Sequence, residues 1–473
     1  MKFLNGMLME FKECFSRKAA FQWFVVIVVG LMVRTDHLGV TSIIRGLMLA
    51  PDYMNLIGFF RSSAWTLEVL TKKWCELVKN HAPVMKQGDA VILVGDGVKQ
   101  AKEGRRMPGV KHQHQESEDS SKSEYMWGHL FGAVGILAGV GDKVFCLPLA
   151  LRIQDGVKTI FGWSKQPERQ TSHVTEMIRL AHATARHFGK AILLLDRLFL
   201  TIPALQTLDT LNAQGQSLHI VTKAKRNCVA YYPAEARTGQ RGRPRKRGAA
   251  VKVFDLFESA LFLSAEIALY GRLEQIRYHS IDLLWGQGLY KRLRFVLVDY
   301  DNTQTVLVST DLALEPLDII KLYSRRFGIE SMFREMKQVV CAFAYRFWSK
   351  HMPKLNRFRK KTDTDPLSQV CDRRARERIK LAVKAIEGFM FFAAVATGLL
   401  QLISLYFSGS GELSNLRYMR TYRNSIVSEA TVADFLRKNF FRLLHSQPDL
   451  GINRIISAKQ SKNFPFCSLS VAS

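Results

Sequence analysis

The sequence predicts an α/β protein in which a mixed α/β core carries a β-rich insertion and is flanked by helical regions. Three observations lead to this fold class. Residues 1–85 have apolar residues at helical spacing and few turn signals. From residue 90, short apolar runs alternate with helical patterns, which is the order of an α/β unit. Residues 226–290 interrupt the alternation with strand-like pieces and glycine-containing turns, which indicates an insertion.

The first part of the core is expected to hold several buried strands. The run AVILVGDG is consistent with a buried strand ending at Asp96. GHLFGAVGILAGV and KVFCLPLALRI predict two more strands with a Gly-Asp turn at 141–142 between them. A helix over about 168–188 precedes the strand AILLLD, which ends at Asp196. A helix over about 201–213 and the strand SLHIVTKA complete this part.

The second half of the chain adds a hairpin and long helices. RLRFVLVDYD and TQTVLVSTDL are joined by an Asp-Asn turn, which predicts a β-hairpin. A long helix is expected over about 315–341, and a further one near 429–445. The chain is therefore divided into a helical N-terminal region 1–85, a first core part 86–225, the β-rich insertion 226–290, a second core part 291–407, and a helical C-terminal region with a tail 408–473.

The charge of the chain indicates a polyanionic partner. The 473 residues suggest roughly two to four structural units, and 47% of them are hydrophobic, enough for a large core. Lys and Arg total 68 against 41 Asp and Glu, a net charge of +27 that would oppose compaction without a partner. Nucleic acid is favoured over an anionic membrane or a ribosome. The exposed basic residues expected in 1–85 suit DNA contact, although a packing region with solvated charges explains them equally well.

Cysteine usage and apolar segments indicate a cytoplasmic protein. The seven cysteines stand singly, without a Cys-x-x-Cys pair, so neither a disulfide framework nor a zinc ribbon is signalled. The run 21–33 is shorter than the roughly 20 residues that span a bilayer. The run 388–407 is long enough, but it contains Gln401 and continues an arginine-rich helical pattern. A buried helix with no membrane contact is favoured, with a membrane span as the alternative.

Two aspartates at expected strand ends suggest a metal site. Asp96 and Asp196 each close a buried strand, and α/β sheets place ligands at such ends. A single Asp of this kind is more often a turn or helix-capping residue. Two of them on one sheet favour a site for a hard divalent ion, which takes oxygen ligands.

A polar stripe on the helix predicted over 315–341 offers a third carboxylate. At about 100° per residue, four side chains fall within about 60° of one another: Tyr323, Arg326, Glu330 and Lys337. Arg334 falls close to this stripe, whereas Glu335 lies well off it. A solvated charged face would explain the stripe alone. Its occurrence beside two strand-end aspartates favours a DNA backbone running past a metal.

The same four residues carry a resemblance to a known family. They match Tyr-x2-Arg-x3-Glu-x6-Lys, a pattern similar to the signature of one large group of DDE transposases from bacterial insertion sequences. VGDG and LLLDRLF look like the first and second aspartate motifs of that group. The similarity covers most of residues 90–340. It implies an RNase H-like core with a β-rich insertion before the glutamate.

The resemblance also implies chemistry and partners. Asp96, Asp196 and Glu330 would hold two Mg²⁺ or Mn²⁺ ions, and water and then a 3′-hydroxyl would attack phosphorus. Tyr323, Arg326 and Lys337, with Arg334 beside them, would contact double-stranded DNA. The expected partners are the terminal inverted repeats of an insertion sequence, target DNA, and a second copy of the chain in a homodimer.

Three features of the sequence stay open. Trp285, in a Trp-Gly-Gln-Gly turn, is the candidate for stacking on a flipped base, as an aromatic of the insertion does in some relatives. Arg241 and Arg243 lie in RGRP, which resembles an AT-hook that enters a narrow minor groove; a generic phosphate-binding loop is favoured. The segment 111–124, with His112 and His114, is expected to be a polar loop rather than a metal site.

Rival functions remain at this level. A catalytically inactive DNA-binding regulator, or a domesticated relative of a transposase, would keep the charge and lose the chemistry. A non-transposing nuclease with an RNase H-like core would keep the carboxylates and lack strand transfer.

Overall fold

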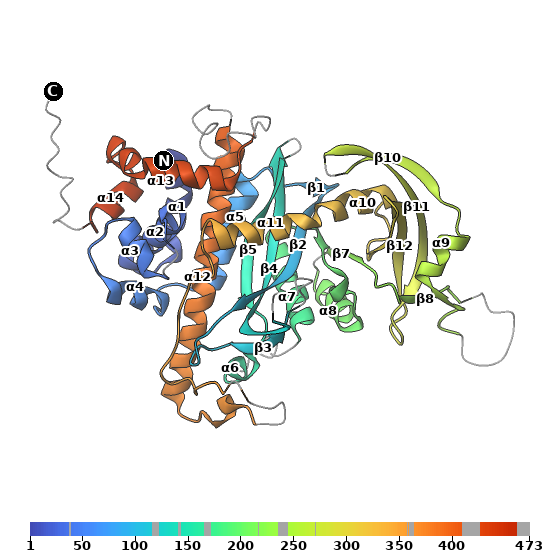
Figure 1. Ribbon diagram of the computed structural model, residues 1–473, viewed down its shortest axis with the longest axis horizontal. Helices are drawn as coiled ribbons and strands as arrows, with labels where there is room; N and C mark the ends of the chain where they lie inside the picture. The colour runs from blue at the N-terminus through green and yellow to red at the C-terminus, as the bar shows by residue number, and fades with distance from the viewer. Residues whose placement is uncertain are drawn as a thin grey trace.

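A single mixed sheet runs through the molecule. The computed structural model describes residues 1–36, 39–115, 123–140, 143–164, 172–215, 217–234, 245–269, 271–356, 358, 364–408 and 426–460. Within these residues the strands join into one 13-stranded sheet. Helices from both ends of the chain gather at one end of the molecule, and the strands of the second half extend it at the other (Figure 1).

The N-terminal region is helical, as the apolar periodicity predicts. Its five helices share one apolar core with the C-terminal helices: α1 (Lys2–Met9), α2 (Lys18–Val33), α3 (Thr41–Gly46), α4 (Tyr53–Phe60) and α5 (Leu67–His81). Helix α2 is buried almost throughout. It therefore serves as a core element and cannot present a long basic face to a partner.

Helix α12 (Arg373–Phe407) connects the helical end to the sheet. It contacts α2, α4 and α5 as well as α13 (Glu429–Ser446), while α14 (Gly451–Ser457) packs on α1 and α2. Among the described residues, α12 is the helix long and apolar enough to cross a membrane, and 89% of its most apolar stretch is buried inside the protein. The buried helix favoured from the sequence is thus the one observed.

Five strands form the part of the sheet that carries the aspartates. Their order is β5 (Lys143–Ile153), β4 (Tyr125–Val140), β2 (Ala90–Ala101), β6 (Ala191–Leu194) and β7 (Leu218–Lys223). The first three strands pair antiparallel, and β6 and β7 run parallel to β2. Short strands β1 (Lys86–Gln87) and β3 (Lys111–His114) add to β2 and β4.

Helices cover both faces of these strands. On one face lies α7 (His173–Ala185): a side chain at Gly95 would meet Met177 of this helix. On the other lies α11 (Gly328–Gln338), whose Met332 approaches Gly135 of β4. α6 (Lys158–Gly162) packs against α12, and α8 (Ile202–Asn212) packs against α7.

Hydroxyl side chains mark where several helices begin. Before α5, α7, α8 and α13, a Ser or Thr hydroxyl accepts a hydrogen bond from the N–H three residues later, which satisfies a donor that the helix leaves unpaired. The four capping residues are Thr66, Ser172, Thr201 and Ser428.

The second half of the sheet continues directly from the first. β13 (Thr303–Ser309) pairs antiparallel with β7, and it is followed outward by β12 (Lys291–Tyr300) and β11 (Arg272–Trp285). β11 also pairs with β10 (Leu263–Leu269) and β8 (Val229–Tyr231); β9 (Ala250–Lys252) and α9 (Leu256–Ser259) complete this end. The predicted hairpin turn between β12 and β13 is confirmed. Its two residues, Asp301 and Asn302, have φ of 49° and 55°, in the left-handed region that such turns require.

Several predicted boundaries were wrong. β2 does not end at Asp96 but runs on to Ala101, because β4 continues to pair with it. The segment 111–124 is not wholly a loop, since 111–114 form β3. The helix expected over 315–341 is divided into α10 (Pro316–Ser324), a 3₁₀ turn at 325–327 and α11. The turn at 141–142 lies outside the described residues.

Candidate active site

The register of the sheet brings the two aspartates to the same level. Val94 of β2 lies beside Leu194 of β6 in the parallel pair. β6 ends there, and Asp196 follows two residues later. Asp96 is thus flanked by Ala133 of β4 on one side and by the end of β6 on the other. β2 itself continues past Asp96, but its neighbour β6 stops at Leu194. On the side of Asp196, Asp96 therefore lies beyond the end of the neighbouring strand.

Arg326 joins the strand of Asp96 to the helix of Glu330. Its Nη1 donates to Asp96 Oδ2 at 3.1 Å, and its Nη2 donates to Glu330 Oε1 at 2.8 Å. The Arg326 and Asp96 side chains are 16% and 23% exposed, whereas Glu330 is 44% exposed. The guanidinium therefore lies between the two carboxylates, with Glu330 on the solvent side.

The charges of all three carboxylates act on this guanidinium. Burial by itself lowers the pKa of Arg326, but the charges of Asp96, Tyr323, Asp196 and Glu330 outweigh that effect and raise the pKa above its usual value. Burial raises the pKa of Asp96, an effect opposed by Arg326 and by the Gly97 N–H, which donates to Asp96 Oδ1 at 2.7 Å. The Arg326 guanidinium thus lies in the field of all three predicted ligands.

A basic cleft opens beside this cluster. Its volume is about 610 Å³, and both Asp96 and Glu330 line it. Three cationic side chains line it as well: Lys99, Arg334 and Lys337. Carboxylates next to cations at the wall of an open cleft are suited to a phosphodiester, whose negative oxygens the cations would attract.

The comparison with protein families decides the relationship. Residues 10–260 match the family described as DDE superfamily endonuclease, which is more than half of the chain. The chain belongs to this family. Asp96 and Asp196 lie inside the matched range, and Glu330 lies beyond it. Comparison with curated proteins and with solved structures gave no match.

Membership of the DDE endonucleases implies DNA as substrate and divalent metal ions as cofactors. Among the residues that the structure describes, no three His, Cys, Asp or Glu side chains form a group that could hold a metal ion. The donor chemistry nevertheless fits: the three candidate ligands are carboxylates, the ligands that Mg²⁺ and Mn²⁺ prefer. A cation already lies in the field of all three.

The remaining residues of the stripe divide between α10 and α11. Tyr323 is half-buried in α10, before the 3₁₀ turn. Lys337 is exposed in the last turn of α11, and Arg334 Nε donates to Glu335 Oε1 at 3.1 Å. Glu335 does not line the cleft, as its angle on the helix predicts.

Two lysines of the site were not singled out from the sequence. Lys99 lines the cleft, three residues after Asp96 on the same strand. Lys223 ends β7, whose parallel register with β6 places it at the level of Asp196. Burial lowers the pKa of Lys223, as do the charges of Arg197 and Arg326, while Asp196 opposes them. In the sequence, Lys223 could have been recognised as a lysine at the end of the third parallel strand, at the same edge of the sheet as the two aspartates.

Trp285 lies away from the carboxylates, in a second cleft. That cleft measures about 330 Å³ and shares no lining residue with the first. Lys225, Tyr231 and Gln287 line it together with Trp285, and Arg247 stacks over the Tyr231 ring at 4.1 Å. Arg241 and Arg243 lie outside the described residues. His112 stacks on Tyr125.

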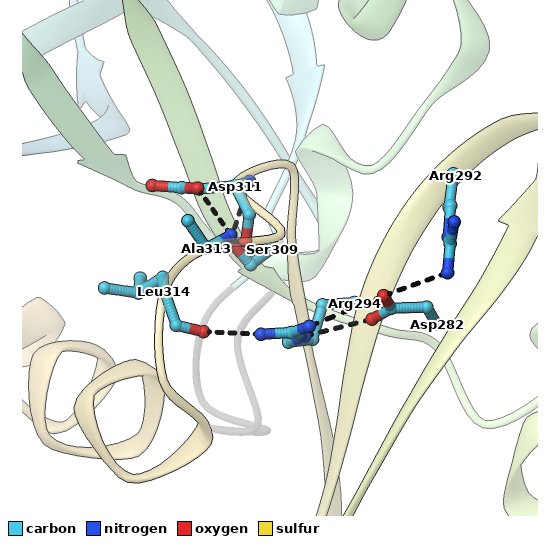
Figure 2. A network of polar contacts seen from close by, with 7 residues as sticks. All are labelled: Asp282, Arg292, Arg294, Ser309, Asp311, Ala313 and Leu314. Atoms are coloured by element: carbon cyan, nitrogen blue, oxygen red, sulfur yellow. Dashed lines mark hydrogen bonds and ion pairs between the residues drawn. The ribbon is translucent and has the colours of Figure 1, made fainter.

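A polar network of β11 and β12 holds the loop that leads into α10. Arg294 Nε donates to Asp282 Oδ1 at 2.9 Å, and its Nη1 donates to the Leu314 carbonyl at 3.0 Å (Figure 2). In the same loop the Ala313 N–H donates to Asp311 Oδ1 at 2.9 Å. β11 and β12 are thereby connected to the loop that leads into α10, the helix of Tyr323.

Proposed function

We propose that this endonuclease is a transposase that hydrolyses phosphodiester bonds at the ends of an insertion sequence and joins the freed ends to target DNA. The observation that supports it most is geometric: Arg326 bonds both Asp96 and Glu330 beside a basic cleft, and the register of β2 and β6 places Asp196 next to Asp96. Cut-and-paste transposition combines these two steps in one site. Both are attacks on phosphorus, first by water and then by a 3′-hydroxyl.

The proposed division of labour follows from charge and position. Asp96, Asp196 and Glu330 would hold two Mg²⁺ or Mn²⁺ ions, which when bound would activate the attacking oxygen and stabilise the leaving one. Lys99, Arg334 and Lys337 would bind phosphates along the cleft. Arg326 would keep Asp96 ionised despite its burial, because its positive charge opposes the rise in pKa.

We further propose that the core is RNase H-like. The order β5-β4-β2-β6-β7, with three antiparallel strands followed by two parallel ones, supports this. In chain order the five strands are β2, β4, β5, β6 and β7. The catalytic acids would then come from the first of them, from the end of the fourth, and from a later helix. The insertion would be residues 226–290, which add β8, β9, β10 and β11 to the sheet, and β12 and β13 would open the second part of the core.

The partners are proposed on the same basis. The net charge of +27 suits double-stranded DNA, and the terminal inverted repeats and target DNA are the substrates expected of a cytoplasmic transposase that acts as a homodimer. The second cleft offers Trp285 and Tyr231 as aromatic walls for a base taken out of the stack.

The test is cleavage of supercoiled DNA that carries the flanking ends of the element, with Mg²⁺ present. We expect cuts at the ends with wild type and none with Asp96→Asn, Asp196→Asn or Glu330→Gln, all of which should still bind DNA. Glu335→Gln is the matched control on the same helix and should stay active. Full activity in any of the first three variants would remove that residue from the ligand set.

A DNA-binding regulator without chemistry is the second candidate. It is favoured by the position of Arg326, whose guanidinium bonds both Asp96 and Glu330 and so places a cation of the protein between two of the predicted metal ligands. Specific binding to the ends without cuts in either Mg²⁺ or Mn²⁺ would support it over the transposase. Cuts without joining to a second duplex would instead indicate a plain nuclease.

A further inference from the structure

The C-terminal end of α11 is held by basic side chains from three distant parts of the chain. Arg437 of α13 donates through Nη2 to the Val339 carbonyl at 2.7 Å. Arg34, which directly follows α2, donates through Nη2 to the carbonyls of Val340 and Cys341 at 2.9 and 2.8 Å. Lys102, which directly follows β2, donates to the carbonyls of Phe343 and Tyr345.

These contacts match what a helix end lacks. The last carbonyls of an α-helix have no partner within the helix, and the helix dipole gives that end a partial negative charge. Arg34 is 1% exposed, and its other amino group donates to the Gly39 carbonyl and to Ser42, so its position is fixed on both sides. The two arginines thus bond the carbonyl of Val339, which caps α11, and those of the two residues that follow it.

The backbone that follows α11 is itself constrained. Cys341 has φ of 57°, a left-handed backbone conformation that residues other than glycine rarely adopt. The Ala342 N–H donates to the Met336 carbonyl at 2.8 Å, which closes the helix. Such a conformation persists where the surroundings over-determine it, and Arg34 on the Cys341 carbonyl supplies one of those constraints.

The opposite end of the same helix carries the site. Glu330 lies in the first turn of α11, about 14 Å along the helix axis from Val339. Lys102 adds a second connection, because its strand, β2, also carries Asp96. An eleven-residue helix fixed at its far end and tied to the strand of Asp96 holds Glu330 at a set position relative to Asp96.

We propose that Arg437, Arg34 and Lys102 are positioning residues that set the place of Glu330 relative to Asp96. They touch neither carboxylate and act through the helix. The inference rests on the proposed function for Glu330. Residues that orient metal ligands without contacting the metal change the metal affinity of a site when they are substituted.

The variant of choice is Arg437→Gln, because Arg437 is partly exposed and its loss is easier to tolerate than that of the fully buried Arg34. Arg437→Lys restores the charge. Arg454→Gln is the control, since Arg454, on α14, forms an exposed ion pair with Asp449.

Two measurements distinguish positioning from mere stability. We expect Arg437→Gln to raise the Mn²⁺ concentration for half-maximal end cleavage about tenfold, the lower end of the range for residues that support metal ligands, with the rate at saturating Mn²⁺ little changed. Arg437→Lys should recover most of the shift. Without metal or DNA, hydrogen exchange should speed up in residues 328–342 of Arg437→Gln and stay unchanged in Arg454→Gln.

The outcomes separate the two proposals. Unchanged exchange in 328–342, or an unchanged Mn²⁺ midpoint in an Arg437→Gln protein that cuts, overturns the positioning role. A lower melting temperature with neither change also overturns it. If wild type cuts no DNA, the proposed function fails, and the exchange measurement still decides whether Arg437 fixes α11.

Discussion

At the scale of single residues, Arg326 is the side chain on which the candidate site depends. Its guanidinium bonds Asp96 and Glu330 through two different nitrogens. A lysine keeps the charge, but all its donors lie on one nitrogen, so it loses the two separate, fixed donor positions with which the guanidinium reaches the two carboxylates. Hydrogen bonds to charged groups contribute about 1.5–3 kcal/mol, which corresponds to a factor of roughly 10–100.

We therefore expect Arg326→Lys to lower the rate of end cleavage about tenfold or more, with DNA binding little changed. The comparison is Arg334→Lys, because Arg334 Nε donates to the adjacent Glu335 and does not bridge two of the candidate metal ligands. Equal effects of the two substitutions on the cleavage rate would contradict the bridging role. Rates would be measured with supercoiled DNA at saturating metal.

His129 makes the stability of the fold depend on pH. It is fully buried, with Nε2 at 2.9 Å from the Pro108 carbonyl and Nδ1 at 2.6 Å from the Tyr345 hydroxyl. Burial lowers the pKa of His129 to about 3 from its usual 6.5. Below pH 6.5 His129 is protonated in the unfolded chain but stays neutral in the folded chain. The stability that is present above pH 6.5 is therefore lost as the pH falls toward 3.

The expected loss from His129 is about 2 kcal/mol between pH 7 and pH 5. Urea unfolding at both values would measure it for wild type and for His129→Gln, which cannot titrate in this range. The variant should start less stable and lose about 2 kcal/mol less over the interval. An identical pH dependence in the two proteins would show that His129 is not held neutral.

At the scale of elements, apolar patterns predicted which segments are strands and helices better than where they end. AILLLD and the hairpin turn at Asp301 and Asn302 were found because local sequence determines them. The extension of β2 past Asp96 could not be predicted, because it depends on pairing with β4. The break at 325–327 was not predicted, because polar and apolar spacing gives no separate signal for a short 3₁₀ turn between two helices.

The candidate site shows the same limit. The strand-end aspartates and the spacing Tyr-x2-Arg-x3-Glu-x6-Lys indicated the carboxylates and the cations near them. The spacing shows which residues share a face of a helix, and it cannot show a partner 230 residues away, as Asp96 is from Arg326. Lys223 and Lys102 were missed for this reason. Their roles arise from strand register and from contacts after the helix ends.

The connection between β12 and the loop before α10 is an element-scale prediction. Arg294 and Asp282 are 20% and 19% exposed, and Arg294 also donates to the Leu314 carbonyl. Arg294→Met removes the donor to the Asp282 carboxylate and to the Leu314 carbonyl. We therefore expect the free energy of unfolding to fall by about 2 kcal/mol. Arg277→Met is the control on β11: Arg277 is 61% exposed in its pair with Asp299, and its loss should change stability by less than about 0.5 kcal/mol. Similar losses in urea titrations would contradict this difference.

At the scale of the whole molecule, the charge predicts how DNA binding responds to salt. The net charge of +27 means that many lysines and arginines can displace counterions from DNA. We expect affinity to fall about 10³-fold or more between 50 and 200 mM salt if six or more phosphates are contacted. Fluorescence anisotropy across that range would measure the slope. A flat response would mean that the charge serves another purpose.

The packing of α12 indicates that the N-terminal helices and the sheet fold as one unit. A side-chain carbon at Gly398 would lie 2.4 Å from Cζ2 of Trp74, far closer than atoms can approach. Trp74 is fully buried in α5, and its Nε1 donates to the Pro148 carbonyl of β5 at 2.9 Å. The indole therefore connects a helix of the N-terminal region to the sheet across α12, and it has little room to move.

We expect Gly398→Ala to destabilise the protein by about 1–3 kcal/mol through overpacking, although alanine favours helices by about 1 kcal/mol over glycine. Gly58→Ala in α4 is the matched control, because no atom lies within 4 Å of the added carbon. It should stabilise by about 0.5–1 kcal/mol. Thermal unfolding followed by circular dichroism should show one transition that moves down for Gly398→Ala and up for Gly58→Ala. Two transitions, with only one of them shifted, would instead show that the N-terminal helices unfold separately from the sheet.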